Sequence, residues 1–177
     1  MATAAILAAT LSHDAQERTA ATQQLEQQLA SDASAYFRAL ADVLTAAEDT
    51  VPAHIRSSAN LAFKNALTAR EAHRQEQYAQ RWLAQSEQVR TELKDKILSA
   101  LGAPERTVRT NAAQLVASIA AIELPQNAWP GLIPALLERS APGQDPKIRQ
   151  AALQTTGYVC ESVVRRLVRK LIVPLVC

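Results

Sequence analysis

The sequence predicts an all-α fold, a right-handed α-solenoid of about four helix pairs, from composition and from an internal repeat. Hydrophobic residues make up 48% of the chain, but they are mostly Ala and Leu, and there are only four glycines. This composition favours helix over sheet. An arginine followed three positions later by alanine recurs at Arg18, Arg56, Arg109 and Arg149. The first and third intervals are roughly 40 residues, near the period of helix-pair solenoids, and the longer middle interval requires an insertion.

The first two helix pairs are predicted over the N-terminal residues. A helix near 3–11 pairs with one near 14–29, whose first turn Asp14 can cap. The second pair begins after a cap at Ser31 or Asp32. Its partner helix starts after Pro52, because proline is tolerated in a first helical turn.

The polar segment 70–87 accounts for the insertion. Tyr78 and Trp82 are spaced by one helical turn and can pin a short extra helix. We interpret Trp82 as a structural anchor, because an aromatic residue at helical spacing is usually core, with direct partner binding as the alternative.

The third and fourth pairs follow the insertion. Gly102 ends the first helix of the third pair, and its second helix carries a polar row of Asn111, Gln114 and Ser118 away from the apolar stripe. In the fourth pair, Asp145 supplies the cap of the second helix, with Cys160 expected on its buried stripe.

The C-terminal segment 163–177 combines apolar residues with Arg165, Arg166, Arg169 and Lys170 in a helix-like rhythm that Pro174 should end. We expect it to prolong the last helix and to fold its apolar side over the end of the stack. A basic amphipathic segment for membrane surfaces or an acidic partner is one alternative, and disorder is another.

Charge, cysteine content and hydropathy narrow the function classes. The net charge is +2, and those four clustered cations alone supply +4, so the rest of the chain is mildly acidic. Nucleic acid is therefore not expected as a partner, because phosphate binding needs a concentrated positive surface. Two cysteines give no disulfide framework and indicate a reducing compartment, the cytosol or nucleus. No secretory signal and no transmembrane segment are expected.

No catalytic or cofactor-binding pattern is present. His13, His54 and His73 lie in separate polar regions without metal-ligand spacing, and no glycine-rich phosphate loop occurs. The sequence therefore predicts neither an enzyme nor a cofactor or metal site.

Several segments carry a resemblance to a known family. Residues 145–152, containing Pro146, Arg149 and Ala152, resemble a HEAT repeat. The run from 113 to 134, with Glu123-Leu-Pro and Trp129-Pro-Gly, closely resembles a repeat junction of the importin-beta family of karyopherin nuclear import receptors. Residues 61–67 and 80–83 resemble further segments of that family, in the same order. The resemblance covers residues 1–162, which correspond to about four repeats. The segment 163–177 departs from the family pattern.

The resemblance implies a nuclear import receptor that binds GTP-loaded Ran through the inner helices of its N-terminal repeats. The candidate Ran contacts are Asn60, Lys64, Asn65, Asn111 and Gln114. A full-length receptor of this family would also bind nucleoporins and importin-alpha or cargo, and would be found in cytoplasm, nucleus and the nuclear envelope or pore. The alternative is a generic HEAT-repeat scaffold for protein interactions that does not bind Ran.

The recurring arginines Arg18, Arg56, Arg109 and Arg149 have a structural interpretation. In helix-pair repeats an acidic residue near the previous helix end or cap can pair with the arginine of the next unit. We therefore predict a ladder of such pairs, in particular at Arg109 and Arg149.

Overall fold

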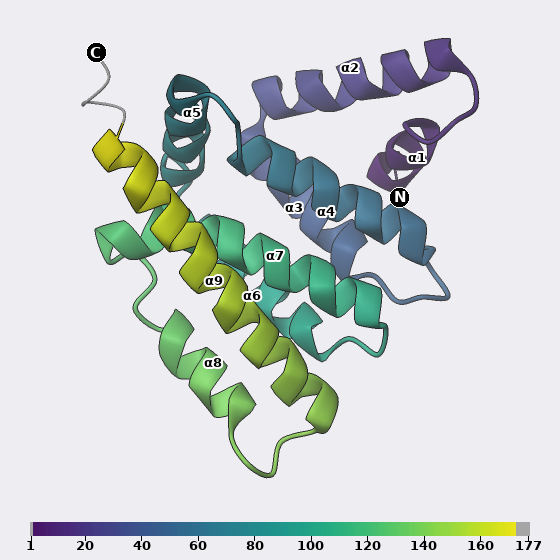
Figure 1. The fold of residues 1–177 in the computed structure, drawn as a ribbon. Helices are drawn as coiled ribbons and strands as arrows, with labels where there is room; N and C mark the ends of the chain where they lie inside the picture. The colour runs from purple at the N-terminus through teal and green to yellow at the C-terminus, as the bar shows by residue number, and fades with distance from the viewer. Residues whose placement is uncertain (1, 173–177) are drawn as a thin grey trace.

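The computed structural model describes the backbone of residues 2–172 and the side chains of residues 2–168. All regular secondary structure in this part of the chain is helical, with nine α-helices and two short 3₁₀ turns. The predicted all-α fold is confirmed. Eight of the helices form four consecutive pairs, and α5 is inserted between the second and third pairs (Figure 1).

The helix bounds follow the predicted order. The pairs are α1 (Ala2–Ala9) with α2 (Ala15–Ser31), α3 (Ala33–Thr45) with α4 (Ala53–Leu67), α6 (Glu87–Ser99) with α7 (Arg106–Glu123), and α8 (Leu132–Ser140) with α9 (Pro146–Ile172). The inserted helix α5 spans Ala72–Leu83, and the 3₁₀ turns span Ala100–Gly102 and Leu124–Gln126.

Side-chain caps define where several of these helices begin. Asp14 accepts a hydrogen bond from the backbone N–H of Gln16, and Asp145 accepts one from Lys147. Of the two caps considered for α3, Asp32 performs the role. These bonds satisfy amide groups that a helix cannot pair within its own first turn.

The pairs stack so that second helices lie beside second helices. α7 packs against α4 on one side and against α9 on the other, while α3 packs against α6 in the layer of first helices (Figure 1). The alanines of the repeated motif lie in this packing, and Ala59, Ala112 and Ala152 are completely buried. Their small side chains allow the helix backbones to approach closely, which explains the recurrence of alanine three residues after the arginine.

The inserted helix is anchored by an aromatic cluster. The Trp82 side chain is fully buried, and its ring centroid lies 5.4 Å from that of Phe37, which in turn lies 4.7 Å from that of Phe63. These three rings join α5 to α3 and α4. The interpretation of Trp82 as a structural anchor agrees with this packing, because edge and tilted ring contacts stabilise a core beyond simple burial.

The segment after residue 162 continues α9 without a break to Ile172, as expected. Among residues 163–168, the apolar side chains do not form the predicted cover over the stack. Val163 packs against the core, but Val164, Leu167 and Val168 are exposed. Instead the basic Arg166 is buried. The expected helix end at Pro174 lies outside the described residues.

Two further observations concern the described region. Cys160, expected on the buried stripe, is exposed on α9, so that prediction was wrong. No helix there combines the length and the apolar character needed to cross a bilayer.

Candidate functional site

The second helices α4 and α7 bring the predicted polar residues together. Lys64 Nζ on α4 lies 3.4 Å from Gln114 Oε1 on α7, and Asn111 Nδ2 on α7 donates a 3.0 Å hydrogen bond to Ser57 Oγ on α4. These bonds join residues about 50 positions apart in the chain. The two helices therefore present one continuous polar surface rather than two separate ones.

The five candidate residues differ in their exposure. Asn65 is exposed, and Lys64, Asn111 and Gln114 are half-buried, so all four can reach a partner. Asn60 is only 5% exposed, and its buried Oδ1 has no hydrogen-bond partner among the described residues. Its side chain lies within the helix packing rather than on the surface, and we leave it out of the proposed contact set.

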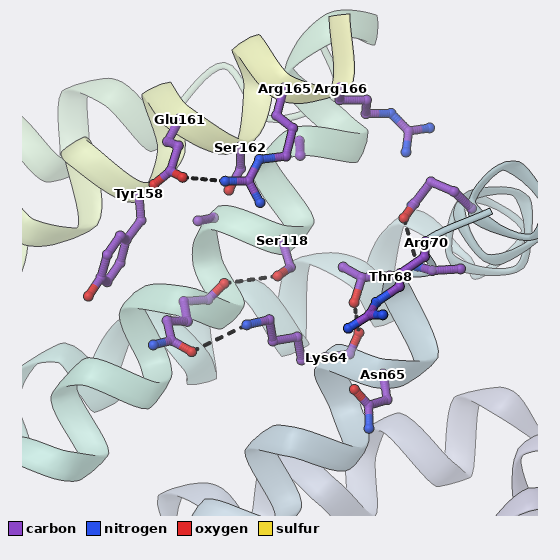
Figure 2. Close-up of a pocket in the computed structure, with 15 residues that line it drawn as sticks. Lys64, Asn65, Thr68, Arg70, Ser118, Tyr158, Glu161, Ser162, Arg165 and Arg166 are labelled. Atoms are coloured by element: carbon purple, nitrogen blue, oxygen red, sulfur yellow. Dashed lines mark hydrogen bonds and ion pairs between the residues drawn. The ribbon is translucent and has the colours of Figure 1, made fainter. Parts of the chain in front are cut away.

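A groove of about 730 Å³ lies along this surface, between α4, α7 and α9 (Figure 2). Lys64, Asn65 and Gln114 line it on the side of α4 and α7. Tyr158 and Glu161 line it on the side of α9. The groove thus gathers three of the sequence-predicted residues and adds a wall from a helix that the predicted set did not include.

Sequence reasoning missed the groove residues Arg70 and Arg165 as members of one site. Arg70 follows the end of α4, and Arg165 belongs to the segment after residue 162. The basic rhythm of that segment was visible in the sequence. Its position across the groove from α4 was not, because that position depends on how α9 packs against α7.

On another side of α7, a buried network fixes the helices that support this surface. The carboxylate of Glu123, fully buried, accepts hydrogen bonds from Trp82 Nε1 at 2.8 Å, from Arg90 at 3.0 Å and from Lys94 Nζ at 2.6 Å. Lys94 Nζ also lies 5.1 Å from the ring centroid of Trp129. A buried carboxylate requires such partners because desolvation of an unpaired charge is costly. Glu123 therefore holds α5, α6 and the end of α7 in one arrangement.

The four recurring arginines share a different role from the predicted ladder. Each donates to backbone carbonyl groups of the loop or helix end that precedes its own helix. The acceptors are Ser12 and His13 for Arg18, Ala46 for Arg56, Ala103 and Pro104 for Arg109, and Ser140 for Arg149. Carbonyl groups outside regular helix lack partners, and a guanidinium offers several donors.

An acidic partner from a neighbouring unit occurs at one of these arginines within the described region. Arg56 donates to Glu105 Oε1 at 2.8 Å, joining α4 to the residue that precedes α7. This hydrogen bond lowers the pKa of the Glu105 carboxyl below its ordinary value. Arg109 and Arg149, for which acidic partners were predicted, bond to carbonyl groups instead.

Among the described residues, no group of three or more His, Cys, Asp or Glu side chains lies close enough to hold a metal ion. The surface is instead a set of amides, hydroxyls and cations, which suits recognition of another macromolecule.

Comparison with known proteins gives consistent relationships. The sequence model described as the Importin-beta N-terminal domain matches residues 21–103. Importin subunit beta-1 of Schizosaccharomyces pombe is 43% identical over 157 residues, which are 89% of this chain and 18% of the relative. The chain thus spans about a fifth of the length of this relative.

Solved structures give the same relationship. A crystal structure of importin beta superposes with a TM-score of 0.85 and 37% identity, over 94% of this chain and 20% of that one. Yeast importin-beta, Kap95p, superposes with a TM-score of 0.86 and 32% identity, over 90% of this chain and 18% of that one. Kap95 has also been solved in complexes with RanGDP and with Nup1, each 31% identical.

The helix stack superposes on importin beta over 94% of the chain. The sequence identity with importin subunit beta-1 extends over 89% of it. The chain belongs to the importin-beta family, as an N-terminal region built from HEAT repeats.

Proposed function

We propose that this chain is the Ran-binding region of a nuclear import receptor, in which Lys64, Asn65, Asn111 and Gln114 contact GTP-loaded Ran. The single observation that carries the proposal is the continuous polar surface of α4 and α7, where residues of successive repeats are joined by hydrogen bonds. The solved complex of the related Kap95 with RanGDP, whose switch loops adopt the GTP-bound conformation on binding, supports Ran as the partner.

A rigid surface of this kind can discriminate between nucleotide states. A GTPase changes the conformation of its switch loops between the two states, so a partner that is complementary to one loop arrangement binds it preferentially. The buried network at Glu123 and the Arg56–Glu105 pair fix the helices that carry the contacts. The contacts are therefore preorganised, which reduces the entropic cost of binding.

The same proposal gives the chain a place in nucleocytoplasmic transport, in cytoplasm and nucleus and at the nuclear pore. The related Kap95 complex with Nup1 supports nucleoporins as further partners of a longer receptor. Importin-alpha or cargo would bind to repeats beyond those present in this chain.

A double substitution tests the contact set. Lys64→Ala with Asn65→Ala should weaken Ran-GTP binding roughly tenfold, because it removes a charged and a neutral hydrogen-bond partner from the surface. The measurement is isothermal titration calorimetry, with helical content checked by circular dichroism. Gln88→Ala with Thr91→Ala, two exposed positions on α6, provides the control and should leave affinity unchanged. Equal affinity of wild type and the Lys64/Asn65 variant would refute the contact assignment.

A further inference from the structure

The groove between α4, α7 and α9 is large enough to bind a ligand, and short side chains line its base. Its volume of about 730 Å³ lies within the range of ligand pockets. The floor is formed by Ala117, Ser118 and Ala121 of α7, whose short side chains leave the space open. Most of the larger lining residues stand on α4, on the loop after it and on α9. An extended segment of another molecule can therefore lie between α4 and α9.

The groove is lined mainly by positively charged side chains. Four cations line it, Lys64, Arg70, Arg165 and Arg166, together with the single carboxylate of Glu161 (Figure 2). The whole chain carries a net charge of only +2. Positive charge is thus concentrated here, on walls contributed by two different helices and the loop after α4.

Internal pairing leaves three of these cations able to bind a ligand. Arg166 is buried and donates to Glu76 of α5 at 3.3 Å, so it serves the structure. Arg165 pairs with Glu161, but both side chains are more than 60% exposed, and such pairs exchange partners at little cost. Lys64 makes only a long 3.4 Å contact with Gln114.

Arg70 is the most available of the three. It is exposed and forms no hydrogen bond or ion pair within the described part of the chain. It lines the groove together with Lys64 and Thr68 (Figure 2). A guanidinium in this position is suited to carboxylate groups, which it can bind through two parallel hydrogen bonds.

We propose that this groove binds an acidic peptide segment, whose carboxylates pair with Lys64, Arg70 and Arg165. Asn65, Thr68 and Ser162 supply neutral hydrogen-bonding groups along the same walls, which suit a peptide backbone. The site goes beyond the Ran surface, because neither Arg70 nor Arg165 belongs to the proposed Ran contact set.

A peptide fits the groove better than a nucleic acid. Nucleic acids carry a charge at every phosphate and require a continuous basic surface. Glu161 interrupts the cations of this groove, so a uniform polyanion meets repulsion there. A peptide can place a neutral residue opposite Glu161 and carboxylates opposite the arginines.

Fluorescence anisotropy with a short labelled peptide of alternating glutamate and serine tests the proposal. The wild-type chain should bind this peptide, more weakly as salt rises, and should not bind the matching peptide of lysine and serine. Arg70→Gln with Arg165→Gln should weaken binding roughly tenfold. Lys147→Gln is the control: it also removes a positive charge, but at the opposite end of α9 from Arg165, and it should change affinity less than about twofold.

A variant with the opposite expected effect guards against loss of folding. Glu161→Gln removes the opposing carboxylate and frees Arg165, so it should strengthen peptide binding about threefold. Binding of the acidic peptide that is unchanged in both the arginine and the Glu161 variants would overturn the proposal. Tighter binding of a single-stranded oligonucleotide of the same length would also overturn it.

The experiment separates this proposal from the proposed function. Because Lys64, Asn65 and Gln114 belong to both surfaces, the peptide should compete with Ran-GTP for the wild-type chain. Peptide binding without any Ran binding would refute the proposed function and leave the groove assignment intact. Ran binding without peptide binding would refute the groove assignment and leave the proposed function intact.

Discussion

Two polar regions beside α7 differ in how completely their charges are paired. At Glu123 one buried carboxylate receives three donors, from α5 and α6. In the groove beside Ser118, cations outnumber carboxylates, and Arg70 has no partner within the described residues. A completely paired, buried charge holds helices together. An exposed surplus of one sign is available for a partner. The residues around α7 thus divide into a structural set at Glu123 and a recognition set in the groove.

The largest effect should come from removing the buried carboxylate. Glu123→Ala leaves Arg90 and Lys94 partly or fully buried without their counter-charge and should lower the free energy of unfolding by about 3–5 kcal/mol. Urea denaturation measures the loss. Glu161→Ala, which removes an exposed carboxylate paired with Arg165, should cost less than about 1 kcal/mol. Equal losses in the two variants would contradict the distinction between the regions.

A smaller effect should follow from removing one donor to Glu123. Trp82→Phe keeps most of the ring packing but deletes the N–H that donates to Glu123, and should lower the free energy of unfolding by about 1–3 kcal/mol. Trp129→Phe is the matched control, because the Trp129 indole N–H donates no hydrogen bond within the described residues. If both substitutions cost the same, the hydrogen bond to Glu123 contributes nothing measurable.

The inter-repeat pair Arg56–Glu105 should give the smallest effect and a pH dependence. The hydrogen bond from Arg56 lowers the pKa of Glu105 in the folded state, so the pair stabilises the fold above the ordinary carboxyl pKa. This contribution is lost as the pH falls through the lowered pKa. Glu105→Gln should therefore cost about 1 kcal/mol at neutral pH and nothing in acid.

Unfolding measured from neutral to acidic pH tests that prediction. The stability curves of wild type and Glu105→Gln should converge at low pH. Glu92→Gln, which breaks an exposed pair with Arg38 between α3 and α6, controls for loss of a carboxylate at a repeat boundary. If the two curves stay parallel down to acidic pH, the Arg56–Glu105 pair is not the source of the pH dependence of stability.

Much of the fold could be predicted because its signals are local. Asp14 and Asp145 cap the helices that their positions indicated, and Trp82 lies at the helical spacing expected of a core anchor. Such features depend on neighbours within a few residues. The order of helix pairs could be read for the same reason.

The site was predicted only in part, because its remaining members meet through packing. Lys64 and Gln114, which were predicted as members of one surface, contact each other and line the groove, but Asn60 on α4 is buried against its neighbours. Arg165 and Arg70 come together through the length of α9 and its crossing of α7, which no local pattern encodes. Arg166 was expected on an exposed cationic face but is buried, which also results from packing between distant helices. It donates a hydrogen bond to Glu76 of α5.

The most direct test of the account is a titration of the purified chain with Ran, loaded either with GTP or with GDP, at near-physiological salt. The account predicts clear preference for the GTP form, because the fixed surface of α4 and α7 is complementary to one arrangement of the switch loops. Absence of binding to both forms would contradict it and leave the chain as a HEAT-repeat scaffold that recognises other partners.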